Sequence, residues 1–175
     1  TQTPQGILTV LEQPVYDLTQ LLEQPDPLFL MLENLQDPGN LGTILRTAEG
    51  AGVTGVILSK GCVDLYNPKT IRSTMGSVYR VPTLYTEDLR ETVELLKAHG
   101  IRSFAAHLKG VNFYDQENYR DGTAFLIGNE GNGLTEELTE QADTLIRIPM
   151  EGKLESLNAG VASAILMYEA YRQRR

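Results

Sequence analysis

The stretch Ile146–Tyr171, IRIPMEGKLESLNAGVASAILMYEAY, decides the fold because a polar loop in it leads directly into an apolar helix. Between residues 159 and 167 Ser163 is the only polar side chain, so we predict a core helix that is buried on several sides. Residues 149–156 are largely polar, and Ser156 and Asn158 are residue types that cap the start of a helix. The backbone of such a loop is available to a ligand.

Apolar runs alternate with helical patterns along the rest of the chain. The run Leu28–Leu32 is apolar throughout, which is typical of a strand buried on both faces in a parallel sheet. Further strands are predicted at 53–58, 78–84, 101–106, 124–127 and 145–148, and further helices around 16–23, 41–48, from 67, 87–99 and 136–142. This alternation predicts an α/β fold with a mainly parallel sheet and helices on both faces.

Three irregular stretches follow predicted strands, at 34–40, 128–134 and 149–156. In open parallel sheets, ligands bind beyond the carboxyl ends of the strands. We therefore expect these three stretches to converge on one functional site.

The composition indicates one soluble domain of 175 residues, 41% hydrophobic and 22% charged. Cys62 is the only cysteine, and with only two histidines there is no zinc-binding set. No apolar run reaches the roughly 20 residues needed to cross a bilayer, and residues 1–10 lack the features of a secretion signal. We expect a cytoplasmic protein without a metal ion and without membrane contact.

The net charge of −8 argues against a general coat for nucleic acids, because phosphate contacts need local positive charge. The basic residues are unevenly spread, however. Lys69, Arg72 and Arg80 lie in one stretch, and three arginines lie between 172 and 175. Local basic patches are therefore compatible with the acidic mean.

Two glycine patterns point away from common nucleotide sites. Residues 50–55, GAGVTG, match the spacing of a dinucleotide-binding loop but end a predicted helix and open a strand, which reverses the required order. The glycines at 128, 131 and 133 follow a strand, but no Gly-Lys-Ser/Thr comes after them. A nucleotide-dependent oxidoreductase is thus disfavoured.

Four motifs together resemble the SpoU-type (TrmH-like) branch of the SPOUT methyltransferases. They are Asn34 with DPGNLGTILRTA (37–48), NPKTIRSTMGSVYRVP (67–82), LIGNEGNGL (126–134) and IPMEGKLESLNAGVASAILMYEA (148–170). The resemblance implies methyl transfer from S-adenosylmethionine to a ribose 2′-hydroxyl of ribosomal or transfer RNA, ribosomal being favoured. It also implies a homodimer and a C-terminal trefoil knot, which general folding rules would not propose. A catalytically inactive, knotted RNA-binding or assembly module is the alternative.

The resemblance also assigns roles to residues. Cofactor contacts fall on Ala106, Leu108, Gly128, Ile148, Met150 and Leu157, and RNA contacts on Arg46, Arg72 and Ser73. The catalytic set is Arg46, supplied near the partner subunit's cofactor, with Asn34, Glu130, Ser156 and Asn158.

Several of these residues also suit purely structural roles. Ile148 and Leu157 are also typical of a hydrophobic core. Asn34, Ser156 and Asn158 are also typical of turns and helix caps. Glu130 either fixes its loop through backbone N–H groups, pairs with Arg46, or is an exposed acid. Arg72 also fits a solvated helix face.

The resemblance begins at residue 28, so we expect residues 1–27 to be a linker with a short N-terminal segment and residues 28–175 to be the catalytic domain. Many SpoU-type enzymes also carry a small N-terminal RNA-binding domain. We expect that domain to be missing from this chain.

Overall fold

The computed structural model describes residues 6, 7 and 9–175, so residues 1–5 and 8 of the predicted linker lie outside the described part. The strands are β1 Leu28–Leu32, β2 Gly55–Ser59, β3 Thr83–Thr86, β4 Arg102–Ala106, β5 Asn112–Phe113, β6 Thr123–Ile127 and β7 Thr144–Arg147. They form one sheet in the order β3-β2-β1-β6-β4-β7-β5, and each neighbouring pair is parallel. The predicted parallel sheet is confirmed.

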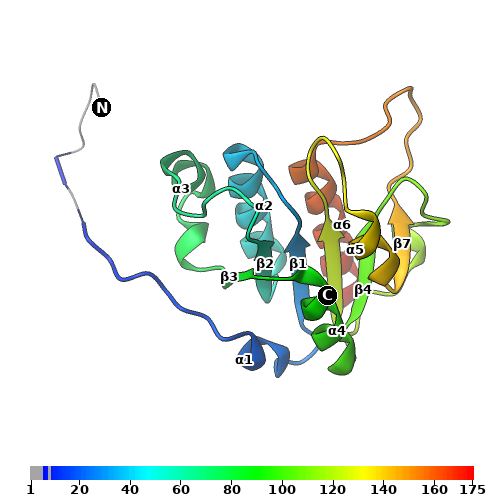
Figure 1. The fold of residues 1–175 in the computed structure, drawn as a ribbon, viewed down its shortest axis with the longest axis horizontal. Coiled ribbons are helices and arrows are strands. Elements are labelled where there is room, and N and C mark those ends of the chain that lie inside the picture. The colour runs from blue at the N-terminus through cyan, green and yellow to red at the C-terminus, as the bar shows by residue number, and fades with distance from the viewer. Residues whose placement is uncertain (1–5, 8) are drawn as a thin grey trace.

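Helices cover both faces of this sheet (Figure 1). They are α1 Leu18–Leu22, α2 Pro38–Ala51, α3 Pro68–Thr74, α4 Leu89–Ala98, α5 Glu136–Gln141 and α6 Ala159–Arg174, with 3-10 turns η1 Ser77–Tyr79 and η2 Tyr114–Gln116. One apolar core lies under α2 and α6, and the other lies under α1, α4 and α5. Leu21 and Leu22 of α1 belong to the second core, so the packed part of the molecule begins before β1.

Strand β1 shows why a continuous apolar run was needed. Leu28, Leu30 and Leu32 enter the core under α2 and α6, whereas Phe29 and Met31 enter the opposite core. Side chains alternate along a strand, so only a run that is apolar at every position supplies both cores. Each such buried side chain contributes about 2 kcal/mol of transfer free energy.

Helix α2 begins and ends at residues suited to these positions. The Asp37 carboxylate accepts a hydrogen bond from the Asn40 N–H at 2.7 Å, and Pro38 occupies the first turn. Gly52 ends the helix in the left-handed region with φ 70°. The stop predicted from the glycines is confirmed, and the pattern at 50–55 ends a helix rather than opening one.

Two predictions about the elements need correction. The strand predicted at 78–84 begins only at Thr83, because Val78 and Val81 are buried in the 3-10 turn and the loop after it. Helix α6 is not buried on several sides, since Val161 and Tyr168 are 48% and 49% exposed. The exposed face of a helix can therefore carry apolar residues as well as polar ones.

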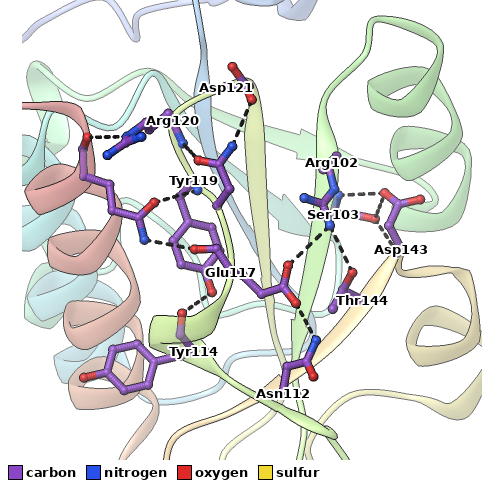
Figure 2. Close-up of polar contacts among 12 residues, drawn as sticks. Arg102, Ser103, Asn112, Tyr114, Glu117, Tyr119, Arg120, Asp121, Asp143 and Thr144 are labelled. Atoms are coloured by element: carbon purple, nitrogen blue, oxygen red, sulfur yellow. Dashed lines mark hydrogen bonds and ion pairs between the residues drawn. The ribbon is translucent and has the colours of Figure 1, made fainter.

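The connection from β4 to β6 contains only β5 and η2, and polar contacts hold it in place (Figure 2). The Glu117 carboxylate accepts hydrogen bonds from the Asn112 amide at 2.6 Å and from the Arg102 guanidinium at 3.4 Å. The buried Tyr119 hydroxyl donates to the Tyr114 carbonyl at 2.5 Å. These contacts fix the loop that follows β4, where one predicted cofactor segment lies.

Candidate functional site

A cavity of about 320 Å³ lies beyond the carboxyl ends of β4, β6 and β7. Its walls come from three segments that are distant in sequence, at 106–108, 127–134 and 146–159. Two of the three predicted loops, those after β6 and β7, line this cavity and rise at the same edge of the sheet (Figure 1). The third predicted loop, after β1, contacts the 128–134 turn through hydrogen bonds described below.

The structure brings all six predicted cofactor residues together around this cavity. The walls include Ala106 at the end of β4, Gly128 after β6, and Leu108, Ile148, Met150 and Leu157. Most of these six side chains are apolar, but polar side chains also line the cavity, among them His107, Arg147, Glu155 and Ser156. A volume of this size with an apolar lining and several polar groups is typical of small-molecule sites, and it fits a flat nucleoside with a polar tail.

Backbone contacts set the shape of the turn that follows β6. Asn129 and Gly133 exchange two backbone hydrogen bonds of 3.0 and 2.9 Å, and Gly133 has φ 71°. A Cβ atom at Gly128 would lie 2.0 Å from the Gly133 carbonyl carbon and 2.1 Å from the Leu134 nitrogen. Only glycine therefore allows this close approach of the two ends of the turn.

Glu130 fastens this turn to the start of α2. Its carboxylate accepts hydrogen bonds from the N–H groups of Gln36 at 3.0 Å and Asp37 at 2.9 Å, and from the Asn40 amide at 3.0 Å. Partial burial acts to raise the pKa of Glu130, but these three donors together hold it below its ordinary value. Glu130 is thus an exposed acid that also makes the contacts expected for loop fixation, and within this chain it makes no ion pair with Arg46.

Asn40 joins Glu130 to the last helix, and the sequence analysis did not single it out. Its side-chain oxygen accepts a hydrogen bond of 2.8 Å from the Asn158 amide. The Asn158 oxygen in turn accepts from the N–H groups of Gly160 and Val161, which caps α6. An asparagine after Pro-Gly indicates only a turn, so no local signal could reveal contacts with residues 90 and 118 positions away.

Glu33 is a second residue that the sequence analysis did not single out. It is 9% exposed, and its carboxylate accepts hydrogen bonds from the Thr135 N–H at 2.7 Å and hydroxyl at 2.8 Å. It thereby holds the start of α5 against the end of β1. The turn 128–134 is thus tied down at Glu130 and immediately after its end.

The remaining predicted residues do not all reach the cavity. Ser156 lines it, whereas the Asn34 side chain contacts the Ser59 hydroxyl at 3.2 Å and its backbone takes φ 52°. The Ser73 hydroxyl faces α2, where it donates to the Pro38 carbonyl at 3.1 Å, and Arg72 is exposed on α3. The catalytic role of Asn34 and the RNA contact of Ser73 stay predictions that these contacts do not support.

Arg46 is exposed on α2, does not line the cavity of its own chain, and forms no ion pair with a described carboxylate. An arginine in this position is free to contact a ligand or another chain.

Across residues 6, 7 and 9–175, no three His, Cys, Asp or Glu side chains gather as a metal site would require. In the same part of the chain, no helix combines the length and the apolar character that a membrane crossing demands.

Residues 27–168 match the model of the SpoU rRNA Methylase family. The chain is 38% identical, over 96% of its length, to 65% of the 23S rRNA (guanosine(2553)-2'-O)-methyltransferase RlmP of Bacillus subtilis. Two solved structures are also similar. The SpoU methyltransferase AviRb from Streptomyces viridochromogenes has a TM-score of 0.85 at 31% identity, covering 92% of this chain and 65% of that one. The AdoMet-bound rRNA methyltransferase from Sinorhizobium meliloti has a TM-score of 0.78 at 38% identity, covering 87% and 59%. The chain thus spans less than two thirds of each of these relatives.

Proposed function

This chain belongs to the SpoU rRNA methylase family, and we propose that it transfers a methyl group from S-adenosylmethionine to a ribose 2′-hydroxyl of RNA, with ribosomal RNA as the favoured substrate. The observation that carries the proposal is the cavity beyond β4, β6 and β7, where six residues expected at the cofactor meet. Similar proteins that are named for rRNA or described with bound AdoMet support the same substrate and cofactor.

We propose that the cofactor lies in this cavity and is held mainly by the backbone of the loops 106–108, 128–134 and 148–157. S-adenosylmethionine supplies a methyl group that its sulfonium already activates. Alignment of the attacking oxygen is then the main contribution of the protein. The ties from Glu130 and Glu33 suit this task, because they hold the 128–134 turn in one conformation.

Arg46 is the proposed catalytic residue. A guanidinium stays protonated under ordinary conditions, so Arg46 is suited to bind the RNA phosphate and to stabilise negative charge that develops on the 2′-oxygen. Ser156 and Asn158 are proposed to support the ribose and the loop, respectively. Since Arg46 does not line its own cavity, the proposal requires that a second protomer supply it.

The exposed face of α6 supports a homodimer. Val161, Tyr168 and Tyr171 are 48%, 49% and 42% exposed, and helical spacing places them along one side of α6. The Tyr168 hydroxyl lies close to Gly50 of α2, the helix that carries Arg46. We propose that this apolar stripe packs against a second copy, and that the trefoil knot of the family is present in each protomer.

Calorimetry of the 175-residue chain tests the cofactor proposal first. We expect S-adenosylmethionine to bind and NAD not to bind; absence of both would favour an inactive RNA-binding module. Methyl transfer to cellular RNA by this protein, with Arg46→Ala as the control, tests the reaction. Methylated ribose is recognised by an alkali-resistant linkage, and a methylated base instead would contradict the proposed acceptor.

A further inference from the structure

The basic residues of this acidic chain divide into two groups. Six of them form ion pairs with described carboxylates, namely Lys60, Arg80, Arg90, Lys97, Arg102 and Arg172. Lys69 and Arg72 of α3 and Arg46 of α2 are exposed and form none. Lys109, Arg120, Arg147, Lys153 and Arg175 are also exposed without an ion pair to a described carboxylate. Arg46, Lys69 and Arg72 differ from these in lying on two packed helices, where positive charge without a carboxylate partner is available to phosphates.

Helix α3 is fixed against the helix that carries Arg46. Gly42 of α2 lies against α3, since a Cβ atom there would be 1.7 Å from the Ser73 hydroxyl. Two turns further along α2, the Glu49 carboxylate accepts hydrogen bonds from the Ser77 hydroxyl and from Arg80. Arg46 is four residues after Gly42 and three before Glu49, so helix geometry places it between these two contacts, beside the junction of α3 and η1.

Two exposed side chains, Met75 and Tyr79, follow the cations of α3 along the chain. Lys69, Arg72 and Met75 follow one another at three-residue intervals along one side of α3 and its end. Met75 is 72% exposed and Tyr79, on η1, is 46% exposed. Met75 takes φ 52°, in the left-handed region that is uncommon for such a residue, and it gains no burial there.

The phenol of Tyr79 lies within electrostatic range of a second phenol, that of Tyr66. Burial raises the pKa of the Tyr66 phenol, and the nearby phenols of Tyr16 and Tyr79 raise it further. Tyr66 lies shortly before α3, and Tyr79 lies on η1 shortly after it. Cations interleaved with an exposed aromatic ring are typical of surfaces that bind single-stranded nucleic acids.

We infer that α3 and η1 form a single-stranded RNA-binding surface in which Lys69 and Arg72 bind backbone phosphates and Tyr79 stacks on a base. An RNA strand bound on this surface extends toward Arg46. In this respect the inference rests on the proposed function. Stacking does not depend on base identity, so the surface contributes affinity and direction rather than sequence specificity.

Fluorescence anisotropy with a labelled single-stranded RNA at several KCl concentrations tests the inference. Lys69→Ala and Arg72→Ala are each expected to reduce the slope of log affinity against log salt by about 0.7, the value for one lost phosphate contact with a single strand. Arg90→Ala is the matched control, because Arg90 is paired with Asp88 on α4, and we expect an unchanged slope.

Tyr79→Ala is expected to weaken binding about tenfold at every salt concentration without a change in slope, whereas Tyr79→Phe retains the affinity. Unchanged slopes in both charge variants, no detectable RNA binding by the wild-type chain, or a loss in Tyr79→Phe equal to that in Tyr79→Ala would each overturn the inference. A Tyr79→Ala variant that changes the sedimentation coefficient but not RNA affinity would assign the surface to a protein contact and overturn it as well.

Calorimetry with S-adenosylmethionine on the same proteins separates this inference from the proposed function. Normal cofactor binding with unchanged salt slopes refutes only the RNA surface. Reduced slopes without any cofactor binding refute the proposed reaction but leave the surface in place.

Discussion

The cavity beyond β4, β6 and β7 and the exposed side of α2 and α3 use different kinds of group. The cavity is lined mainly by backbone and apolar side chains, so its binding properties depend on shape. The α2 and α3 side presents Arg46, Lys69 and Arg72 without carboxylate partners in the described chain, so its properties depend on side-chain charge. Added bulk should therefore impair the cavity, whereas lost charge should impair the α2 and α3 side.

Removal of the Arg46 charge is the largest expected effect. Arg46→Ala should reduce the methyl-transfer rate about 10²- to 10³-fold, because one group that stabilises developing charge is lost. S-adenosylmethionine affinity, measured by calorimetry, should not change. A comparable loss of cofactor affinity would mean that Arg46 belongs to the cavity. It would contradict the distinction between the cavity and the α2 and α3 side.

Added bulk in the turn 128–134 should instead lower the affinity for S-adenosylmethionine. Gly128→Ala should weaken S-adenosylmethionine binding about a hundredfold, because the new Cβ atom conflicts with the backbone at Gly133 and a displacement of about 1 Å in a site has such an effect. Gly131→Ala is the matched control in the same turn, since its Cβ atom would meet only Asn129 at 3.5 Å. Calorimetry of both variants decides the point, and equal affinities would contradict it.

Loss of the bridge between the two regions should have a moderate effect. Asn40→Ala removes hydrogen bonds to Glu130 and Asn158 and should lower the free energy of unfolding by about 1–2 kcal/mol, as measured in urea. The pKa of Glu130 should rise, since one of its donors is lost. Asn132→Ala, at an exposed amide of the same turn, is the control and should unfold like the wild type.

The smallest effect concerns the contact between α2 and η1. Hydrogen bonds from Arg80 and Ser77 lower the pKa of Glu49 to about 2, from an ordinary value of 4.5. A carboxylate with a lowered pKa stabilises the fold fully above its ordinary value and loses this contribution as the pH falls to its folded-state value. Glu49→Gln should therefore shift the urea midpoint slightly at pH 7 and not at pH 2. Glu91→Gln is the control, and a Glu49→Gln difference that grows as the pH falls would contradict the account.

The sheet could be predicted from sequence largely because its central strands are apolar runs. Leu28–Leu32 is predicted with the bounds that the structure has, since each of its side chains is needed in one of two cores. Strand β5, with two residues, has no pattern of its own. The strand predicted at 78–84 was too long, because Val78 and Val81 are buried outside a strand. An apolar residue in the sequence indicates burial but does not tell whether the buried residue lies in a strand.

The candidate site was predictable where a residue type is required locally, and not where it acts at a distance. The convergence of the loops after β6 and β7 could be predicted from the parallel sheet, whereas the six cofactor residues were assigned by the resemblance to a family, and the structure places all six around the cavity. Asn40 and Glu33 escaped notice because their partners are about 90 to 118 residues away in sequence. The exposed stripe on α6 escaped notice because its residues are as apolar as a buried face.

Mixed dimers reveal whether one protomer's cavity works with the other protomer's Arg46. Gly128→Ala and Arg46→Ala chains, each strongly impaired alone, would be co-refolded and assayed for methyl transfer. The account predicts a return to about a quarter of wild-type activity, because half of the dimers are mixed and each mixed dimer has one intact composite site. Activity no higher than that of the separate variants, with mixed dimers present in sedimentation, would contradict it.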